Sequence, residues 1–233
     1  MPIYRNAFYW FIGLLVLLIL GFWKSYFSQL PDTGHITHHA HGMVMLAWVL
    51  LLIVQSWLIR NRRNARHRLI GKISFVIAPA VVVTAIFVNF FFQANAKDPA
   101  APLTQSIYWL GYASAGTFAI MYGLAIRHRR EMHLHARYMV GAALVFLVPG
   151  LGRAITNYLT PTGIWTPSFF QTVWIPLLIG GWLLFSDWRH QQKLAPYATF
   201  CALWAATVVL WVLLPTWGWW NAFSVWSATA ISW

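Results

Sequence analysis

The segment GMVMLAWVLLLIVQSWLI, Gly42–Ile59, is followed directly by RNRRNARHR, Arg60–Arg68. The first segment carries no charge and is close to the ~20 apolar residues that cross ~30 Å of hydrocarbon. The second is strongly basic, as are loops that stay on the cytoplasmic face of a membrane. An apolar run that ends in a basic loop predicts a transmembrane helix.

Seven apolar runs fill most of the 233 residues, with short polar segments between them. Only 9% of the residues are charged, whereas soluble domains are about 25% charged. The sequence therefore predicts an all-α polytopic membrane helix bundle, residues 1–233 forming a single transmembrane domain. The predicted spans are Phe8–Tyr26, Gly42–Ile59, Leu69–Phe92, Ser106–Ile126, Tyr138–Tyr158, Ser168–Trp188 and Pro196–Leu214.

The placement of lysine and arginine orients the predicted bundle. Thirteen of the sixteen basic residues lie near the N-terminus and in the segments after spans two, four and six. Only Lys24 and Lys97 lie on the other side, and Arg153 lies within a span. The positive-inside rule therefore predicts a cytoplasmic N-terminus and an external C-terminus in a bacterial inner membrane. The net charge of +12 then indicates membrane lipids as partners, not nucleic acid, because the loops are too short for a reading module.

The few polar residues inside the spans are candidate functional residues, because a charge in lipid costs roughly 2.5–3.5 kcal/mol. Helical spacing places His41, Trp48 and Gln55 on one face of span two, and His135 and Arg153 on one face of span five. We expect Arg153 to face inward and to meet the end of span two that carries His41. The alternative is an arginine that snorkels to the membrane surface.

Two polar layers follow from these faces. The outer layer contains candidate ligands for a transition-metal ion, because imidazole is the commonest metal ligand; they are His35, His38, His39 and His41, with Asp32, Arg153 and Asn157 nearby. The inner layer contains His67 and His135, which each begin a span and are candidate ligands of haem b iron, with Arg68 or Arg137 neutralising the propionates. The alternative is that these histidines lie among lipid headgroups and bind nothing.

The stretch HAHGMVMLAWVLLLIVQSWLIRNRRNARHRLIGK, followed by HARYMVGAALVFLVPGLGR, resembles a widespread family of bacterial multi-pass proteins known only as a domain of unknown function. The resemblance covers a four-helix core, residues 38–158, and implies no reaction. Residues 168–233 add two helices and a tryptophan-rich tail that we expect at the outer membrane surface. A weaker similarity is to transmembrane b-type cytochromes, from which the chain departs because spans three and four contain no histidine. The matching positions are His41, Gln55, His67, Arg68, Gly71, His135, Met139 and Arg153.

Two classes of function fit these features. The first is a membrane protein that holds a haem, a metal ion or a quinone-like ligand at histidine-bearing helix ends and is redox-linked, for example in electron transfer. The second is a non-catalytic accessory or assembly subunit of a larger complex with other membrane subunits. A metal-dependent hydrolase and a proton-coupled transporter are disfavoured, because no carboxylate lies in the interior of a span. A retinal protein is excluded, because the last span has no lysine.

Overall fold

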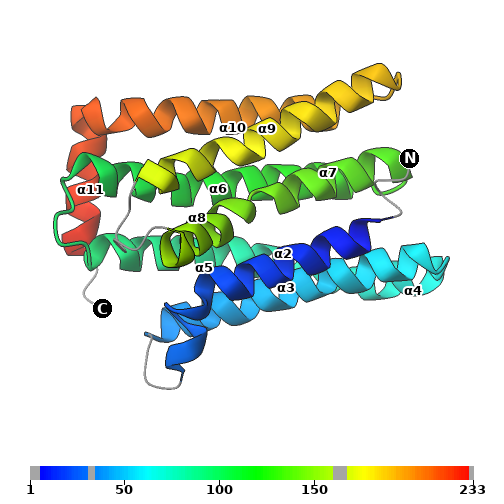
Figure 1. The fold of residues 1–233 in the computed structure, drawn as a ribbon, viewed down its shortest axis with the longest axis horizontal. Helices are drawn as coiled ribbons and strands as arrows, with labels where there is room; N and C mark the ends of the chain where they lie inside the picture. The colour runs from blue at the N-terminus through cyan, green and yellow to red at the C-terminus, as the bar shows by residue number, and fades with distance from the viewer. Residues whose placement is uncertain (1–5, 31–34, 160–166, 231–233) are drawn as a thin grey trace. The chain divides into compact units, whose positions relative to one another are not determined.

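The computed structural model describes residues 6–30, 35–159 and 167–230, and every regular element in these ranges is a helix (Figure 1). The prediction of an all-helical fold is confirmed. In chain order the elements are α2 (Ala7–Trp23), the short 3-10 helix η1 (Phe27–Gln29), α3 (Ile36–Arg60), α4 (Asn64–Gly71), α5 (Ser74–Ala94), α6 (Pro102–Arg127), α7 (Met132–Leu144), α8 (Leu147–Tyr158), α9 (Pro167–Arg189), α10 (Ala195–Leu213), the short 3-10 helix η2 (Leu214–Thr216) and α11 (Gly218–Ala230).

Five helical segments are long and apolar enough to cross a membrane, and they correspond to predicted spans two, three, four, five and seven. The other two predicted spans fall on α2, an apolar helix of 17 residues, and on α9, which has 23 residues. That α2 and α9 also cross the membrane stays a prediction. The five segments are Ile36–Arg60, Ser74–Ala94, Pro102–Arg127, Met132–Tyr158 and Ala195–Thr216.

The third span begins later than its predicted start at Leu69. Helix α4 ends at Gly71, a turn occupies residues 72–73, and α5 begins at Ser74. The basic segment after α3 is therefore largely helical, because arginine is a good helix former and does not oppose helix formation next to an apolar run.

The fifth span is interrupted between α7 and α8, at Val145 and Phe146. Pro149 explains the interruption. A proline ring clashes with the carbonyl group four residues earlier, here that of Val145, and proline has no N–H to donate. The Phe146 N–H instead donates to the Ala143 carbonyl at 3.1 Å, a tighter turn than that of an α-helix.

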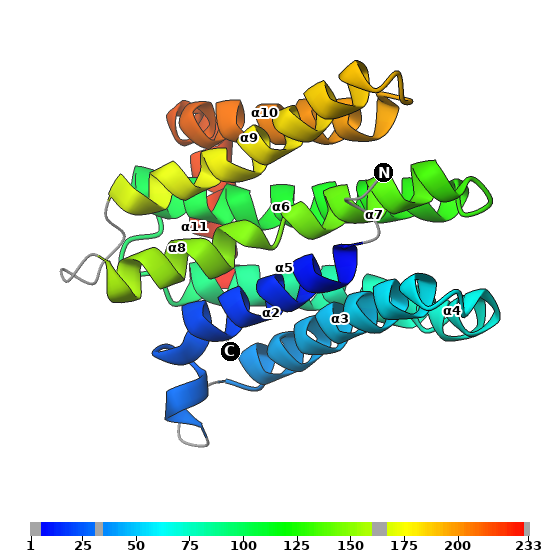
Figure 2. The same cartoon turned by 45° about the vertical axis from the view of Figure 1, so that its right-hand side comes forward.

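The chain divides into two compact units, residues 1–81 with 143–178, and residues 82–142 with 179–233. In unit 1, α2 packs against both α3 and α8 (Figures 1 and 2). Helices α2 and α8 approach closely where Gly21 faces Gly150, since a Cβ atom at Gly21 would overlap the Gly150 carbonyl oxygen. This contact positions α8, the helix that carries Arg153.

In unit 2, α6 packs along α10, and the tryptophan-rich tail forms α11. Trp220 of α11 is buried against Tyr108, whereas Trp219 and Trp226 are exposed. The Gln93 amide of α5 donates to the Ser224 hydroxyl oxygen at 2.5 Å, so a polar contact attaches α11 to the rest of unit 2. Trp233, also part of the predicted tail, lies outside the described residues.

Candidate functional site

Three polar side chains come together in unit 1: His38 and His41 from α3, and Arg153 from α8. We call them the histidine–arginine cluster. The charge of Arg153 acts on both histidines, and His38 acts on His41. This effect agrees with the expectation that Arg153 meets the end of α3 that carries His41, which stays a prediction.

Arg153 is held by two contacts besides the histidines. Its guanidinium carbon lies 4.3 Å from the centroid of the Phe22 ring on α2, and its Nη1 donates to the Pro149 carbonyl oxygen at 3.3 Å. The side chain is only partly exposed. Both contacts use groups that carry no net charge, so the positive charge of the arginine remains uncompensated by them.

Asn157, which we expected in the outer polar layer, connects α8 to α2. Its side-chain Nδ2 donates to the Gly21 carbonyl oxygen at 2.9 Å. Its backbone carbonyl oxygen accepts from Lys24 Nζ at 2.6 Å. These bonds reinforce the close approach of the two helices at Gly21 and Gly150. Asp32, the acidic member of the predicted layer, lies outside the described residues.

The four histidines of the predicted metal site have different neighbours. His35 is the N-cap residue of α3, since its Nδ1 accepts from the Thr37 backbone N–H at 3.4 Å. The Nδ1 atom of His39 lies 2.7 Å from the Tyr26 hydroxyl oxygen in a hydrogen bond. Within residues 6–30, 35–159 and 167–230, no three His, Cys, Asp or Glu side chains are arranged to hold a metal ion. The predicted metal-ion site thus has no support from these residues and stays a prediction.

Unit 1 stabilises its cations with aromatic rings rather than carboxylates. Nine of the sixteen basic residues lie in this unit, together with only one of the four acidic residues, Asp32. In the part of the unit that the structure describes, no carboxylate pairs with Arg153. Four cations lie over rings, with distances to the ring centroid of 4.3–4.9 Å: Arg153 over Phe22, Arg60 over Tyr9, Arg63 over Trp57 and Lys24 over Tyr158.

Gln55 connects α3 to α4 through His67 and Gly71. In the orientation that satisfies its neighbours, the Gln55 amide nitrogen donates to the His67 carbonyl oxygen at 3.1 Å and to His67 Nδ1, and its oxygen accepts from the Gly71 N–H at 3.0 Å. A neutral His67 ring then carries its proton on Nε2, and a protonated nitrogen does not ligate a metal. Of the other candidates in unit 1, Trp48 is fully buried and Arg68 is exposed on α4.

His135, in unit 2, has the opposite arrangement. Its Nδ1 lies 2.9 Å from the Ala125 carbonyl oxygen. A carbonyl only accepts, so Nδ1 donates and a neutral His135 ring carries its proton on Nδ1. Arg137, a predicted partner of haem propionates, instead pairs with Asp187 inside the protein. His67 lies in unit 1 and His135 in unit 2, so a haem shared by both stays a prediction.

Sequence reasoning missed the contacts that depend on which helix faces meet. Arg137 and Asp187 are 50 residues apart, and no spacing rule connects them. The ring contact between Arg153 and Phe22 depends in the same way on the packing of α2 against α8. One signal was present in the sequence: Asp187 lies at the end of a predicted span, where an acidic residue needs a partner.

The chain is thus an all-helical protein with five segments suited to crossing a membrane, two of which carry the histidine–arginine cluster. No protein family, curated protein or solved structure matches it. The resemblances to the uncharacterised multi-pass family and to b-type cytochromes stay predictions.

Proposed function

We propose that this is an inner-membrane protein with seven spans, a cytoplasmic N-terminus and an external C-terminus. Five segments suited to crossing, the coincidence of α2 and α9 with predicted spans, and the unequal distribution of lysine and arginine support the proposal. A reporter enzyme fused after Trp233 tests it. Activity restricted to the external side is expected, and activity restricted to the cytoplasm overturns the orientation.

The proposed function is to hold a quinone-like ligand at the histidine–arginine cluster. One observation carries this proposal: a guanidinium and two imidazoles on two candidate spans lie within electrostatic range of one another, with no carboxylate pairing with the arginine among the described residues. Such a set can donate hydrogen bonds to carbonyl oxygens and stabilise an oxyanion that forms on reduction. It is poorly suited to binding a cation, because Arg153 supplies a fixed positive charge.

Each member of the cluster has a distinct role in this proposal. Arg153 orients one carbonyl oxygen of the ligand and lowers the energy of the reduced, negatively charged form. His38 and His41 carry imidazole groups that can donate and accept protons, which a quinone requires when it takes up two electrons and two protons. Phe22, already in contact with the guanidinium, offers a flat apolar surface next to the same position.

The quinone version has more support than the haem version. A haem held by His67 requires Nε2 to lose the proton that the bond from Gln55 places there. The haem version predicts a Soret band in the visible spectrum of the purified protein, with α and β bands on reduction. The visible spectrum is therefore the first experiment for distinguishing a haem from a quinone.

Binding of a short-chain ubiquinone analogue tests the quinone proposal. Quenching of tryptophan fluorescence in detergent measures affinity, and solvent extraction of the purified protein measures retained quinone. We expect Arg153→Leu to weaken binding about 10-fold or more, as loss of a charged hydrogen bond of 1.5–3 kcal/mol implies, while membrane insertion persists. Arg153→Lys keeps the charge but loses the guanidinium fork, so we expect an intermediate loss. His190→Gln, at an exposed histidine of unit 2, is the control. Equal affinity in the wild type and both Arg153 variants refutes the proposal.

The accessory-subunit function is favoured by a different observation. On α9, large apolar side chains that are exposed recur at helical spacing, so that one stripe faces outward. In this version Arg153→Leu leaves the protein without a measurable defect in ligand binding, whereas polar substitutions in the stripe release a partner subunit from the purified complex. The stripe consists of Trp174, Leu178, Trp182, Phe185 and Trp188.

A further inference from the structure

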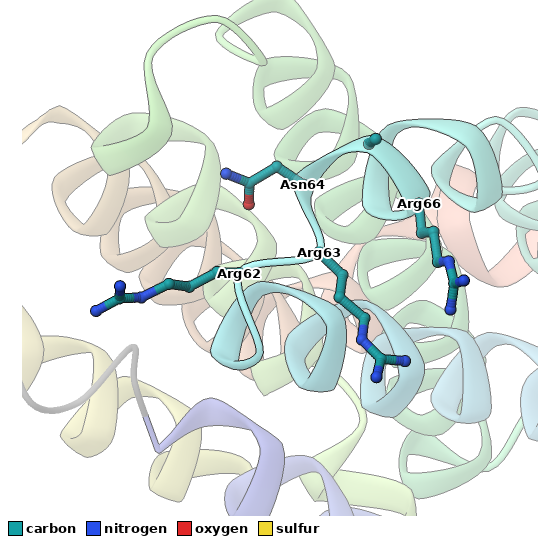
Figure 3. A pocket seen from close by; sticks show the side chains of 5 residues that line it. Arg62, Arg63, Asn64 and Arg66 are labelled. Carbon is teal, nitrogen blue, oxygen red and sulfur yellow. The ribbon is translucent and has the colours of Figure 1, made fainter.

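We propose that the turn between α3 and α4 binds a phosphate group. A pocket of about 370 Å³ lies at this turn (Figure 3). Three of its five lining residues are arginines, and none is acidic: Arg62, Arg63, Asn64, Ala65 and Arg66. This pocket lies within unit 1 and is distinct from the histidine–arginine cluster.

The charges at this turn have no counterion in the neighbouring sequence. No aspartate or glutamate occurs between residues 33 and 97. The three acidic groups of unit 2 already have partners, since Glu131 contacts His128 and Lys193, Asp187 contacts Arg137, and Asp98 accepts from the Ala100 N–H. An anion from outside the chain can therefore bind to these exposed arginines. Guanidinium groups match phosphate oxygens geometrically, because they donate two parallel hydrogen bonds.

Backbone hydrogen bonds fix the shape of the turn. The Arg62 N–H donates to the Ile59 carbonyl at 3.0 Å, and the Arg63 N–H donates to the Leu58 carbonyl at 2.8 Å. This pattern is a Schellman motif, whose left-handed position usually holds glycine. Here Arg62 occupies that position with a φ of 57°. An arginine thus occupies a position where glycine fits the backbone better.

The side chains at the turn are also oriented by their contacts. The Arg63 guanidinium carbon lies 4.8 Å from the centroid of the Trp57 ring, which limits its motion. Arg63 and Arg66 extend to the same side of the turn (Figure 3). The first residues of α4 lie at the same place, and the N-terminus of a helix adds a further attraction for anions.

The depth of the turn indicates where the phosphate comes from. Helix α3 is a candidate span that ends at Arg60, so in a membrane the turn lies at the level of the lipid headgroups. A phospholipid headgroup and free inorganic phosphate both supply the required chemistry. The inference depends on α3 crossing the membrane and does not depend on the quinone proposal.

Two measurements distinguish the two sources. Native mass spectrometry after addition of phosphatidylglycerol or phosphatidylcholine measures bound lipid, and calorimetry of the delipidated protein with inorganic phosphate measures the free anion. The test variant is Arg62→Gln with Arg63→Gln and Arg66→Gln. The matched control is Arg127→Gln with Arg129→Gln and Arg130→Gln, which removes the same charge from exposed positions of unit 2.

We expect the test variant to bind about 10-fold less phosphatidylglycerol than the wild type. The control should bind about as much as the wild type. If only the test variant loses the heat of inorganic phosphate binding, the pocket binds free phosphate, and this result also supports the proposal. Equal losses in the two triple variants, or no loss in either measurement, overturn it.

Arg62→Gly provides a second test if the triple variant does not fold. Glycine suits the φ of 57°, so we expect thermal stability equal to or above that of the wild type. Binding of phosphatidylglycerol or phosphate should nevertheless fall severalfold. A glycine variant that binds both as well as the wild type overturns the proposal.

Discussion

Arg137 of α7 and Asp187 of α9 form a buried ion pair with two parallel hydrogen bonds. Arg137 Nε donates to Asp187 Oδ2 at 2.7 Å, and Nη2 donates to Oδ1 at 3.0 Å. Both residues are no more than 2% exposed. Arg137 Nη1 also donates to the His133 carbonyl oxygen, so the buried guanidinium is well satisfied. Removing one partner leaves an uncompensated buried charge, whereas removing both does not.

The first prediction is that Asp187→Ala lowers the free energy of unfolding by about 3–5 kcal/mol. Arg137→Ala should have a similar effect, and the double variant should lose less than the sum of the two. Unfolding in detergent, followed by circular dichroism, provides the measurement. Lys193→Ala is the control, because its ion pair with Glu131 is exposed and should contribute little. Losses that simply add in the double variant would falsify the pairing.

The positions of the helices followed from the sequence because apolar runs of sufficient length leave the backbone little alternative in a membrane. The positions of His41 and Arg153 on their own helices were also predictable, since helical spacing sets the depth of each residue. The contacts of Arg137 were not, because spacing along one helix does not tell which other helix it faces. The site of Arg62 was missed for another reason: a basic loop indicates topology, and the turn geometry appears only in the structure.

The second prediction concerns pH and the exposed contact at Glu131. Hydrogen bonds from His128 and Lys193 lower the pKa of the Glu131 carboxyl, and the one from His128 has the larger effect. The folded pKa thus lies below the unfolded one, so the contribution to stability is complete above the ordinary glutamate value of about 4.3 and is lost as pH falls through the folded pKa. The stability difference between the wild type and Glu131→Gln should therefore be present at pH 5 and vanish in stronger acid. A difference that grows as the pH falls below about 5 has the wrong sign for this contact.

The third prediction is that His67 and His135, when neutral, carry their protons on different nitrogens. His67 Nδ1 accepts from Gln55, so the proton of the neutral His67 ring is on Nε2. His135 Nδ1 donates to the Ala125 carbonyl oxygen, so the proton of the neutral His135 ring is on Nδ1. Nitrogen-15 NMR of selectively labelled protein distinguishes the two tautomers. In Gln55→Leu the preference of His67 should disappear, and that of His135 should not change. The same tautomer at both residues in the wild type contradicts the arrangement of Gln55.

The last prediction uses two glycines of α2 that have different surroundings. A Cβ atom at Gly21 would overlap the Gly150 carbonyl oxygen, whereas one at Gly13 would meet nothing within 4 Å. Alanine in a helix interior is favoured over glycine by roughly 0.5–1 kcal/mol. Forcing extra volume into a packed contact costs about 1–3 kcal/mol, so the cost should exceed the gain at Gly21 only.

Gly13→Ala should therefore be neutral or slightly stabilising, and Gly21→Ala should be destabilising, as measured by thermal unfolding in detergent. The effect should extend to the site. Gly21 is adjacent to Phe22, and the displaced α8 carries Arg153, so separating the helices breaks the ring contact of the guanidinium. We expect Gly21→Ala to weaken binding of the short-chain ubiquinone analogue severalfold, with Gly13→Ala unchanged. If Gly21→Ala is as stable as Gly13→Ala, α2 and α8 do not approach as closely as the Gly21–Gly150 contact requires, and α2 does not position Arg153.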